Sequence, residues 1–275
     1  MKILAIVLTY YPERDLLIQN ISAFIDHVDK VLIWENTPSS EIDDYKFIEH
    51  EKVEYYGDGL NSISHALNYA WKYAVSKDFD YLLTMDQDSI FKNFNFYLEK
   101  ITLRFSQNTE TFGIYTPQIL GRKVERDIEK IDMPITSGML LPVVLINQIG
   151  GWDEEFKIDS VDDEFSSHAH SLGIRTFVVK DAILVQRFGA PKVVKALGHT
   201  WRLRNYSASR LHDIFMNNTI LIKRYPEATY LRDNFKRTWV KYIRYIFLEK
   251  NTFSKLKAII CGVLAGIKYN RNHPQ

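Results

Sequence analysis

Two acidic residues one position apart, Asp86 and Asp88, are the clearest candidates for chemistry in this sequence. They follow the apolar run at 81–85, so we expect them directly after a buried strand. Carboxylates this close repel each other unless a cation lies between them, and Mg²⁺ and Mn²⁺ prefer carboxylate oxygens together with substrate phosphates. The pair therefore predicts a divalent metal site that neutralises a diphosphate leaving group, the alternative being a solvated turn.

A second group of acids follows a segment that contains Trp152 and Asp153. Acids at the start of a helix cap it and complement its dipole, so we expect some of this group to be structural. The same concentration of carboxylates could supply a general base that deprotonates an attacking hydroxyl. The members of the group are Asp159, Asp162, Asp163 and Glu164.

The elements that would position these acids alternate between strands and helices. Continuous apolar runs at 3–8, 31–34 and 81–85 are typical of strands covered on both faces. A short third strand is expected at 53–56, which makes the run at 81–85 the fourth. Apolar residues at helical spacing predict helices over 13–28 and 63–75. This alternation predicts an α/β fold with a doubly wound, Rossmann-like and mostly parallel sheet.

Polar residues follow three of the expected strands. Thr9 and Tyr11 follow the first strand, Glu35 and Asn36 the second, and Asp86 the fourth. Open α/β sheets bind ligands at the carboxyl ends of their strands, so three such groups on one edge predict a nucleotide site. Turns and helix caps remain the alternative for each group taken singly. Neither GxGxxG nor GxxxxGK[ST] is present, so dinucleotide and P-loop binding are not indicated.

The rest of the chain is divided into a less regular middle and a helical end. We assign 1–200 to the α/β domain and 201–275 to a helical extension packed on it, with breaks at Pro226 and Asn251. Further strands are expected at 112–116, 135–141, 175–179 and 183–185, and a helix at 161–172.

The helical extension is strongly basic. From Lys223 to Arg271 the sequence has twelve Lys or Arg and three Asp or Glu. Its longest apolar run, 258–267, is about half as long as a bilayer-spanning helix requires. The extension is therefore expected either to contact an anionic membrane surface or to pack on the core with a solvated basic face. Because the isoelectric point of the whole chain is only about 7.8, no nucleic-acid partner is expected.

Four short motifs together resemble family 2 glycosyltransferases of the GT-A fold, in particular the bacterial rhamnosyltransferase-like branch. LTYYP at 8–12 resembles the opening (V)TYNP, and WENT at 34–37 resembles the VDNxS segment. MDQDS at 85–89 resembles the metal motif of the family. The most specific stretch is TSGMLLPVVLINQIGGWDEEFKIDSVDDEFSSHAHSLG at 136–173, and the resemblance covers roughly residues 3–220.

The resemblance implies roles for the candidate residues. Asp86 and Asp88 would hold the metal ion and the diphosphate, and Asp162 would be the base of a single in-line displacement that inverts the anomeric centre. Residues expected to bind the base and ribose are Thr9, Tyr11, Glu35 and Asn36. Gly138 would give room near the donor sugar, and the acceptor side would be shaped by Trp152, Asp153, Asp159, Asp163 and Glu164.

Four positions depart from the family pattern. Tyr11 replaces the usual Asn, Glu35 replaces the usual Asp, and Ser62 lies where a glycine is usual. Gln186 lies where the branch commonly has a His that contacts metal or phosphate. These departures leave the sugar and the nucleotide open, while the metal carboxylates and Asp162 are intact.

The resemblance implies an enzyme that moves a sugar from a nucleotide-diphosphate donor to an acceptor hydroxyl. It favours rhamnose from dTDP-rhamnose. Docking of the basic extension on an anionic membrane would bring the site to a glycan or lipid-linked acceptor, as in bacterial cell-surface polysaccharide synthesis. The expected location is therefore cytoplasmic and peripheral to the inner face of the membrane. Two alternatives stay open, namely a metal-dependent nucleotidyltransferase-type enzyme and a non-enzymatic basic-tailed binder of membranes or RNA.

Overall fold

Four parallel strands carry the residues singled out near the N-terminus. The computed structural model describes residues 1–38, 46–107, 113–187, 192–196 and 199–270. β1 pairs in parallel with β2 and with β4, and β2 pairs in parallel with β3. Every residue of β1 is buried, as expected for a strand covered on both faces. The bounds are β1 (Ile3–Thr9), β2 (Lys30–Glu35), β3 (Val53–Tyr56) and β4 (Tyr81–Asp86).

The sheet continues beyond β4 with mixed strand directions. Its order is β3-β2-β1-β4-β8-β6-β9-β5, and β7 also pairs with β9. β6 and β9 are parallel, whereas β8, β5 and β7 are antiparallel to their neighbours. This mixed, mostly parallel sheet confirms the predicted fold class. The bounds are β5 (Ser89–Phe91), β6 (Ile114–Ile119), β7 (Ile128–Lys130), β8 (Leu140–Pro142) and β9 (Thr176–Gln186).

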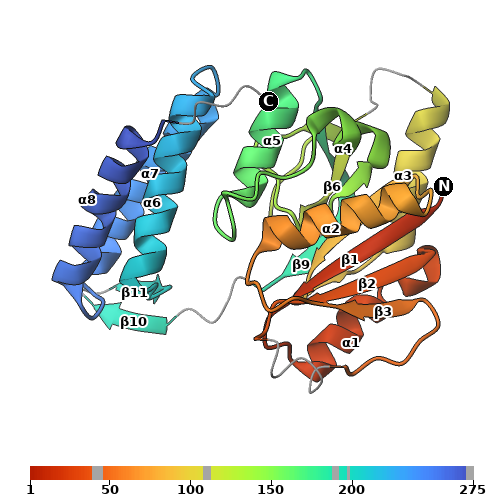
Figure 1. Cartoon of the computed structure of the whole chain (residues 1–275), viewed down its shortest axis with the longest axis horizontal. Helices are drawn as coiled ribbons and strands as arrows, with labels where there is room; N and C mark the ends of the chain where they lie inside the picture. The colour runs from red at the N-terminus through yellow and green to blue at the C-terminus, as the bar shows by residue number, and fades with distance from the viewer. Residues whose placement is uncertain (39–45, 108–112, 188–191, 197–198, 271–275) are drawn as a thin grey trace. The chain divides into compact units, whose positions relative to one another are not determined.

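Helices cover both faces of the sheet. On one face, Leu17 and Ile21 of α1 and Phe94 and Tyr97 of α3 share a core cluster with alternate residues of the strands. On the other face, α2 packs on β1 and β4 and also contacts α4, and Figure 1 shows it lying across the sheet. The bounds are α1 (Arg14–Ser22), a 3₁₀ helix (Ile25–His27), α2 (Ile63–Ser76), α3 (Phe94–Gln107), α4 (Val143–Ile149) and α5 (Val161–Ser171).

The chain divides into two compact units, Met1–Gln186 and Arg187–Gln275. The second unit has an antiparallel hairpin followed by three helices, with a small core of its own around Phe215 and Ile259. α8 packs closely on α6, where a side chain at Gly262 would lie 2.3 Å from the His212 carbonyl oxygen. The bounds are β10 (Lys192–Ala196), β11 (His199–Leu203), α6 (Ala208–Arg224), α7 (Thr229–Ile246) and α8 (Thr252–Lys268).

The structure corrects some of the expected elements. The strand expected at 135–141 is reduced to β8, because Gly138 has a φ of +83° that breaks the extended backbone. The two strands expected at 175–185 are one strand, β9. The helical breaks near Pro226 and Asn251 are confirmed. The expected boundary near residue 200 falls inside β11, and packing of the extension on the core stays a prediction. Within the described residues, no helix is both long and apolar enough to span a bilayer.

Candidate active site

Three of the sequence motifs meet at the carboxyl ends of β1, β2 and β4. In the parallel registers, Thr9 lies beside Glu35 and Leu8 lies beside Asp86. The backbone N–H of Tyr10 donates to Gln87 Oε1 at 2.7 Å, and Gln87 Nε2 donates back to the Tyr10 carbonyl at 3.0 Å. The edge of the sheet therefore brings together the segments that the motifs predicted to form one site.

Glu35 is buried at the end of β2 and is held by threonine side chains. Its Oε2 accepts a hydrogen bond from Thr9 Oγ1 at 2.8 Å, and its Oε1 accepts one from the Thr37 N–H at 2.8 Å. The Thr37 hydroxyl also donates to Oε1. The carboxylate thus joins the ends of β1 and β2. Whether Thr9 and Glu35 also bind a base or ribose stays a prediction.

Tyr11 and Asn36 lie next to this buried group. Tyr11 is 43% exposed and has a φ of +46°, and its N–H donates to Thr37 Oγ1 at 2.8 Å. Asn36 is buried, and its Oδ1 accepts from the Ser62 N–H at 3.3 Å. A positive φ is uncommon for a residue other than glycine, so Tyr11 occupies a strained position of the kind that is enriched at functional sites.

Asp86 carries the strongest electrostatic signal of the sheet edge. Burial, with added repulsion from Asp162 and Asp88, raises the pKa of Asp86 to about 7. Gln186 Nε2 donates to Asp86 Oδ2 at 2.8 Å and opposes the shift. An acid that is buried beside other acids favours a bound cation or a bound proton. The proximity of Asp88 and Asp162 to the buried Asp86 is the central feature of the site.

Two side chains that sequence reasoning did not place at Asp86 hold it in position. Gln186, at the end of β9, directs its amide nitrogen to the carboxylate, while its Oε1 is buried without a hydrogen-bond partner. Asn20 of α1 donates to the Asp86 carbonyl at 2.7 Å and also to the Ser89 carbonyl. Gln186 was noted only as a departure from the family pattern, and no local signal marked Asn20.

Asp162 and Asp163 lie in the first turn of α5. Burial and the charge of Asp159 raise the pKa of Asp162, although Asp162 Oδ2 accepts a hydrogen bond from the Thr136 N–H at 3.4 Å. Burial and the charge of Asp162 raise the pKa of Asp163 to about 7. Ser160, just before α5, has a φ of +70°. The N-terminus of α5 therefore presents the Asp162 carboxylate close enough to Asp86 to raise the pKa of Asp86.

A divalent metal ion is compatible with this group of acids. Within the described residues, no set of three His, Cys, Asp or Glu side chains is arranged as a complete metal cluster. Mg²⁺ in particular is commonly held by only one or two carboxylates together with substrate phosphates, so two aspartates do not require a third ligand from the chain. The raised pKa of Asp86 and the unpartnered Oε1 of Gln186 both fit a cation at this place.

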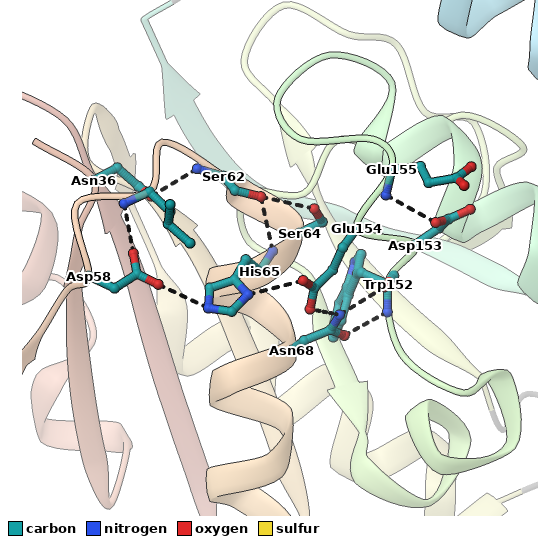
Figure 2. Close-up of polar contacts among 11 residues, drawn as sticks. Asn36, Asp58, Ser62, Ser64, His65, Asn68, Trp152, Asp153, Glu154 and Glu155 are labelled. Atoms are coloured by element: carbon teal, nitrogen blue, oxygen red, sulfur yellow. Dashed lines mark hydrogen bonds and ion pairs between the residues drawn. The ribbon is translucent and has the colours of Figure 1, made fainter.

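The predicted acceptor side is held against α2 by a polar network (Figure 2). Asn68 forms two backbone hydrogen bonds with Trp152, accepting from its N–H at 2.8 Å and donating to its carbonyl at 2.8 Å. His65 lies between two acids, with Nε2 3.0 Å from Asp58 and Nδ1 3.0 Å from Glu154. The network ties the segment before α5 to the loop before α2.

Sequence reasoning did not find the α2 network. His65 and Glu154 are 89 residues apart in the sequence, so no local spacing reveals that they form a pair. The predicted acceptor-side residues are placed by the same region: Trp152 stacks on Phe165 with ring centroids 4.4 Å apart, and Asp153 accepts from the Glu155 N–H at 3.1 Å. Glu164 is 3% exposed. Their roles toward an acceptor stay predictions.

Gly138 has a structural reason to be glycine. A side chain there would lie 2.5 Å from Pro117, and its φ of +83° disfavours any other residue. Its neighbour Ser137 accepts a hydrogen bond from the Asp86 N–H at 3.0 Å. The segment therefore passes close behind Asp86. Whether it also gives room to a donor sugar stays a prediction.

Comparison with solved structures identifies the architecture. GalNAc-T7, crystallised with UDP, GalNAc and Mn²⁺, matches with a TM-score of 0.61 at 10% identity, over 81% of this chain and 48% of that chain. Residues 1–349 of S. aureus TarS with UDP-GlcNAc match with a TM-score of 0.54 at 15% identity, over 96% of this chain and 81% of that chain. The chain has the GT-A fold. It spans about half the length of the GalNAc-T7 chain.

Sequence comparison agrees with the GT-A fold. RfbF of Shigella flexneri, described as a dTDP-rhamnosyl transferase, is 26% identical over 223 residues, which are 71% of this chain and 72% of the relative. No family model matches the chain. The chain is therefore similar to a glycosyltransferase in sequence and to glycosyltransferases of the GT-A fold in structure.

Proposed function

We propose that this protein is an inverting glycosyltransferase that moves a sugar from a nucleotide-diphosphate donor to an acceptor hydroxyl. The observation that carries the proposal is the pairing of Asp86 and Asp88 with Asp162 at the strand ends of a GT-A fold. Two of these acids come from a strand end and the third from a helix start. Such an arrangement can hold a cation and a diphosphate on one side and a base on the other.

Asp86 and Asp88 would hold a divalent ion, Mg²⁺ or Mn²⁺, which supplies charge neutralisation for the departing nucleoside diphosphate. Gln186 orients Asp86 through its hydrogen bond. The crystal structure of GalNAc-T7 contains Mn²⁺, which supports a divalent ion here as well. Thr9, Tyr11, Glu35 and Asn36 form the adjoining strand ends and are the proposed nucleotide contacts.

Asp162 is the proposed base. Its pKa is raised by burial, so its basicity lies closer to what proton transfer at neutral pH requires. It would take the proton from the acceptor hydroxyl as the oxygen attacks the anomeric carbon, and the bond to the diphosphate would break on the opposite face. Inversion follows from this single displacement.

The proposed donor is dTDP-rhamnose and the proposed acceptor is a lipid-linked glycan in bacterial cell-surface polysaccharide synthesis. The description of RfbF as a dTDP-rhamnosyl transferase supports the donor. The GalNAc-T7 and TarS structures contain UDP and UDP-GlcNAc, so uridine nucleotides are the competing choice. The proposed location is cytoplasmic and peripheral to the membrane.

A thermal-shift panel of dTDP-rhamnose, dTDP, UDP and UDP-GlcNAc, each with Mn²⁺ or with EDTA, tests the proposal. Ligand at about 100 times its dissociation constant stabilises the folded state by about 2.7 kcal/mol. We expect stabilisation by one nucleotide class, and only with Mn²⁺. Stabilisation by uridine ligands alone would reject dTDP-rhamnose. Equal stabilisation in EDTA would reject the metal, and no stabilisation by any nucleotide would reject the function.

A further inference from the structure

The cations of the second unit have two different roles. Lys255 is buried, and its Nζ is 2.7 Å from Glu249 and 2.9 Å from Asn205 Oδ1. Lys223 Nζ donates to the carbonyls of Ile267 and Tyr269 at the end of α8, a position that favours a cation. These two charges serve the fold. The basic character predicted for the whole extension therefore has to be assigned to other residues.

A groove of about 440 Å³ lies along the face of α7 that is turned away from the core of the second unit. Among the described residues, no carboxylate lies within ion-pair distance of three of its four cations, and Lys236 alone approaches an acid, Asp233, at 3.7 Å. The groove therefore concentrates positive charge that the carboxylates of the described residues leave largely unneutralised. Its cations are Lys236, Arg237, Lys241 and Arg244, and its aromatic walls are Trp201 and Tyr245.

Lys241 lies on the aromatic side of the groove. Its Nζ lies 5.9 Å from the Tyr245 ring centroid and 6.0 Å from that of Tyr242. Burial and the nearby charge of Arg204 lower the pKa of Lys241. A phosphate in the groove would oppose both effects, because its negative charge would stabilise the charged ammonium group that burial and Arg204 disfavour.

Exposed apolar side chains lie beside the cations on the same helix. Val240, Ile243 and Phe247 are 51%, 40% and 72% exposed. Phe247 directly follows the last residue of α7, and the spacing of the three residues places them on one side of the helix. The same spacing places Arg237, Lys241 and Arg244 in a neighbouring row. A free phosphate would gain nothing from the apolar row, whereas a lipid leaflet takes up both rows at once.

We propose that the outer face of α7 docks on an anionic lipid leaflet. The groove lined by the cations, Trp201 and Tyr245 receives lipid phosphates, and the row of Val240, Ile243 and Phe247 enters the headgroup region. This assigns to one helix face the contact that the sequence predicted only for the basic extension as a whole. The surface belongs to the second unit, so the docking does not depend on glycosyl transfer.

Co-sedimentation of the full chain with phosphatidylcholine vesicles, with and without phosphatidylglycerol, tests the docking. We expect binding only to the anionic vesicles, and release at high salt. The double variant Lys241→Gln/Arg244→Gln should lower the partition coefficient about 30-fold, because each basic residue close to an anionic leaflet contributes roughly fivefold. Phe247→Ser should also weaken binding. All three side chains lie on the outer face, and circular dichroism checks that the variants fold.

The matched control is Lys123→Gln/Arg126→Gln, which removes two exposed cations from the first unit. It should bind like the wild type. An equal loss of binding in both double variants would show that binding follows net charge, and it would overturn the proposal that the groove on α7 is the docking site. Wild-type binding by Lys241→Gln/Arg244→Gln would do the same. Release by inorganic phosphate, at an ionic strength where chloride has no effect, would make the occupant a free phosphate instead of a lipid.

Discussion

Replacing Asp86 by Asn tests the electrostatic account of the active site. The pKa of Asp86 is raised from 3.8 to about 7 in the folded protein. The folded state therefore binds a proton that the unfolded state has already lost, and stability without metal falls as pH rises from about 4 to 7. Three pKa units correspond to about 4 kcal/mol. Asn carries no charge, and its Oδ1 can still accept the hydrogen bond from Gln186.

The assay is urea unfolding, followed by circular dichroism in EDTA at pH 5 and pH 8. Between these values the wild type should lose about 3 kcal/mol through Asp86, since two pKa units lie between pH 5 and the raised pKa. Asp86→Asn should lose less and should be more stable than the wild type at pH 8. The control is Asp127→Asn, which changes the same charge on a side chain that is 79% exposed.

The account is wrong if Asp86→Asn is less stable than the wild type at pH 8, or if both proteins have the same pH dependence. When Mn²⁺ and a nucleoside diphosphate are added at pH 8, the wild type should become more stable than Asp86→Asn. The bound cation would stabilise the wild type through Asp86, whereas the variant would gain little.

Three further predictions concern neighbouring parts of the site. Asp162→Asn should retain nucleotide binding by calorimetry and lose transfer by 10²–10⁴-fold, the usual contribution of a general base. Near-wild-type turnover would move the base to Asp159, Asp163 or Glu164. His65→Gln breaks the connection between Asp58 and Glu154, so amide hydrogen exchange in 150–157 should accelerate while nucleotide binding is unchanged. Unchanged exchange would show that His65 does not hold this segment in place. Gly151→Ala should cost about 1–3 kcal/mol in urea unfolding, because its φ is +86° and the new carbon would lie 2.5 Å from the Trp71 ring; a smaller loss would show that the loop can move.

The central strands could be predicted because they are encoded locally. β1, β2 and β4 are continuous apolar runs, and β3 was predicted with its observed bounds. β5 and β7 have three residues each, too few to show a period. β9 was read as two strands because Asp181, with a φ of +63°, interrupts its pattern at a bulge. Short or bulged strands are held by their neighbours, and a single sequence does not reveal those neighbours.

The candidate site was predictable to the extent that it is local. Asp86 and Asp88 are recognisable from their position after β4, and the acids of α5 from their density. Gln186 reaches Asp86 across 100 residues, and His65 reaches Glu154 across 89. Such contacts depend on how β9 and α2 are placed in the fold. The sequence therefore indicates the candidate acids, whose roles stay predictions, but not the distant residues that contact them or tie the neighbouring loops.

The close approach of α8 to α6 has a consequence for how this chain can diverge. Gly262 and Gly266 lie one helical turn apart, and a side chain at either would meet α6 at 2.3 Å or 2.6 Å. Apolar residues in a core can be exchanged if the total volume is kept, but a backbone contact leaves no volume to redistribute. In descendants of this sequence the two glycines should persist while the exposed residues of α8 change freely. The spacing of these two small residues would then be a more durable marker of the second unit than the residues on the exposed face of α8.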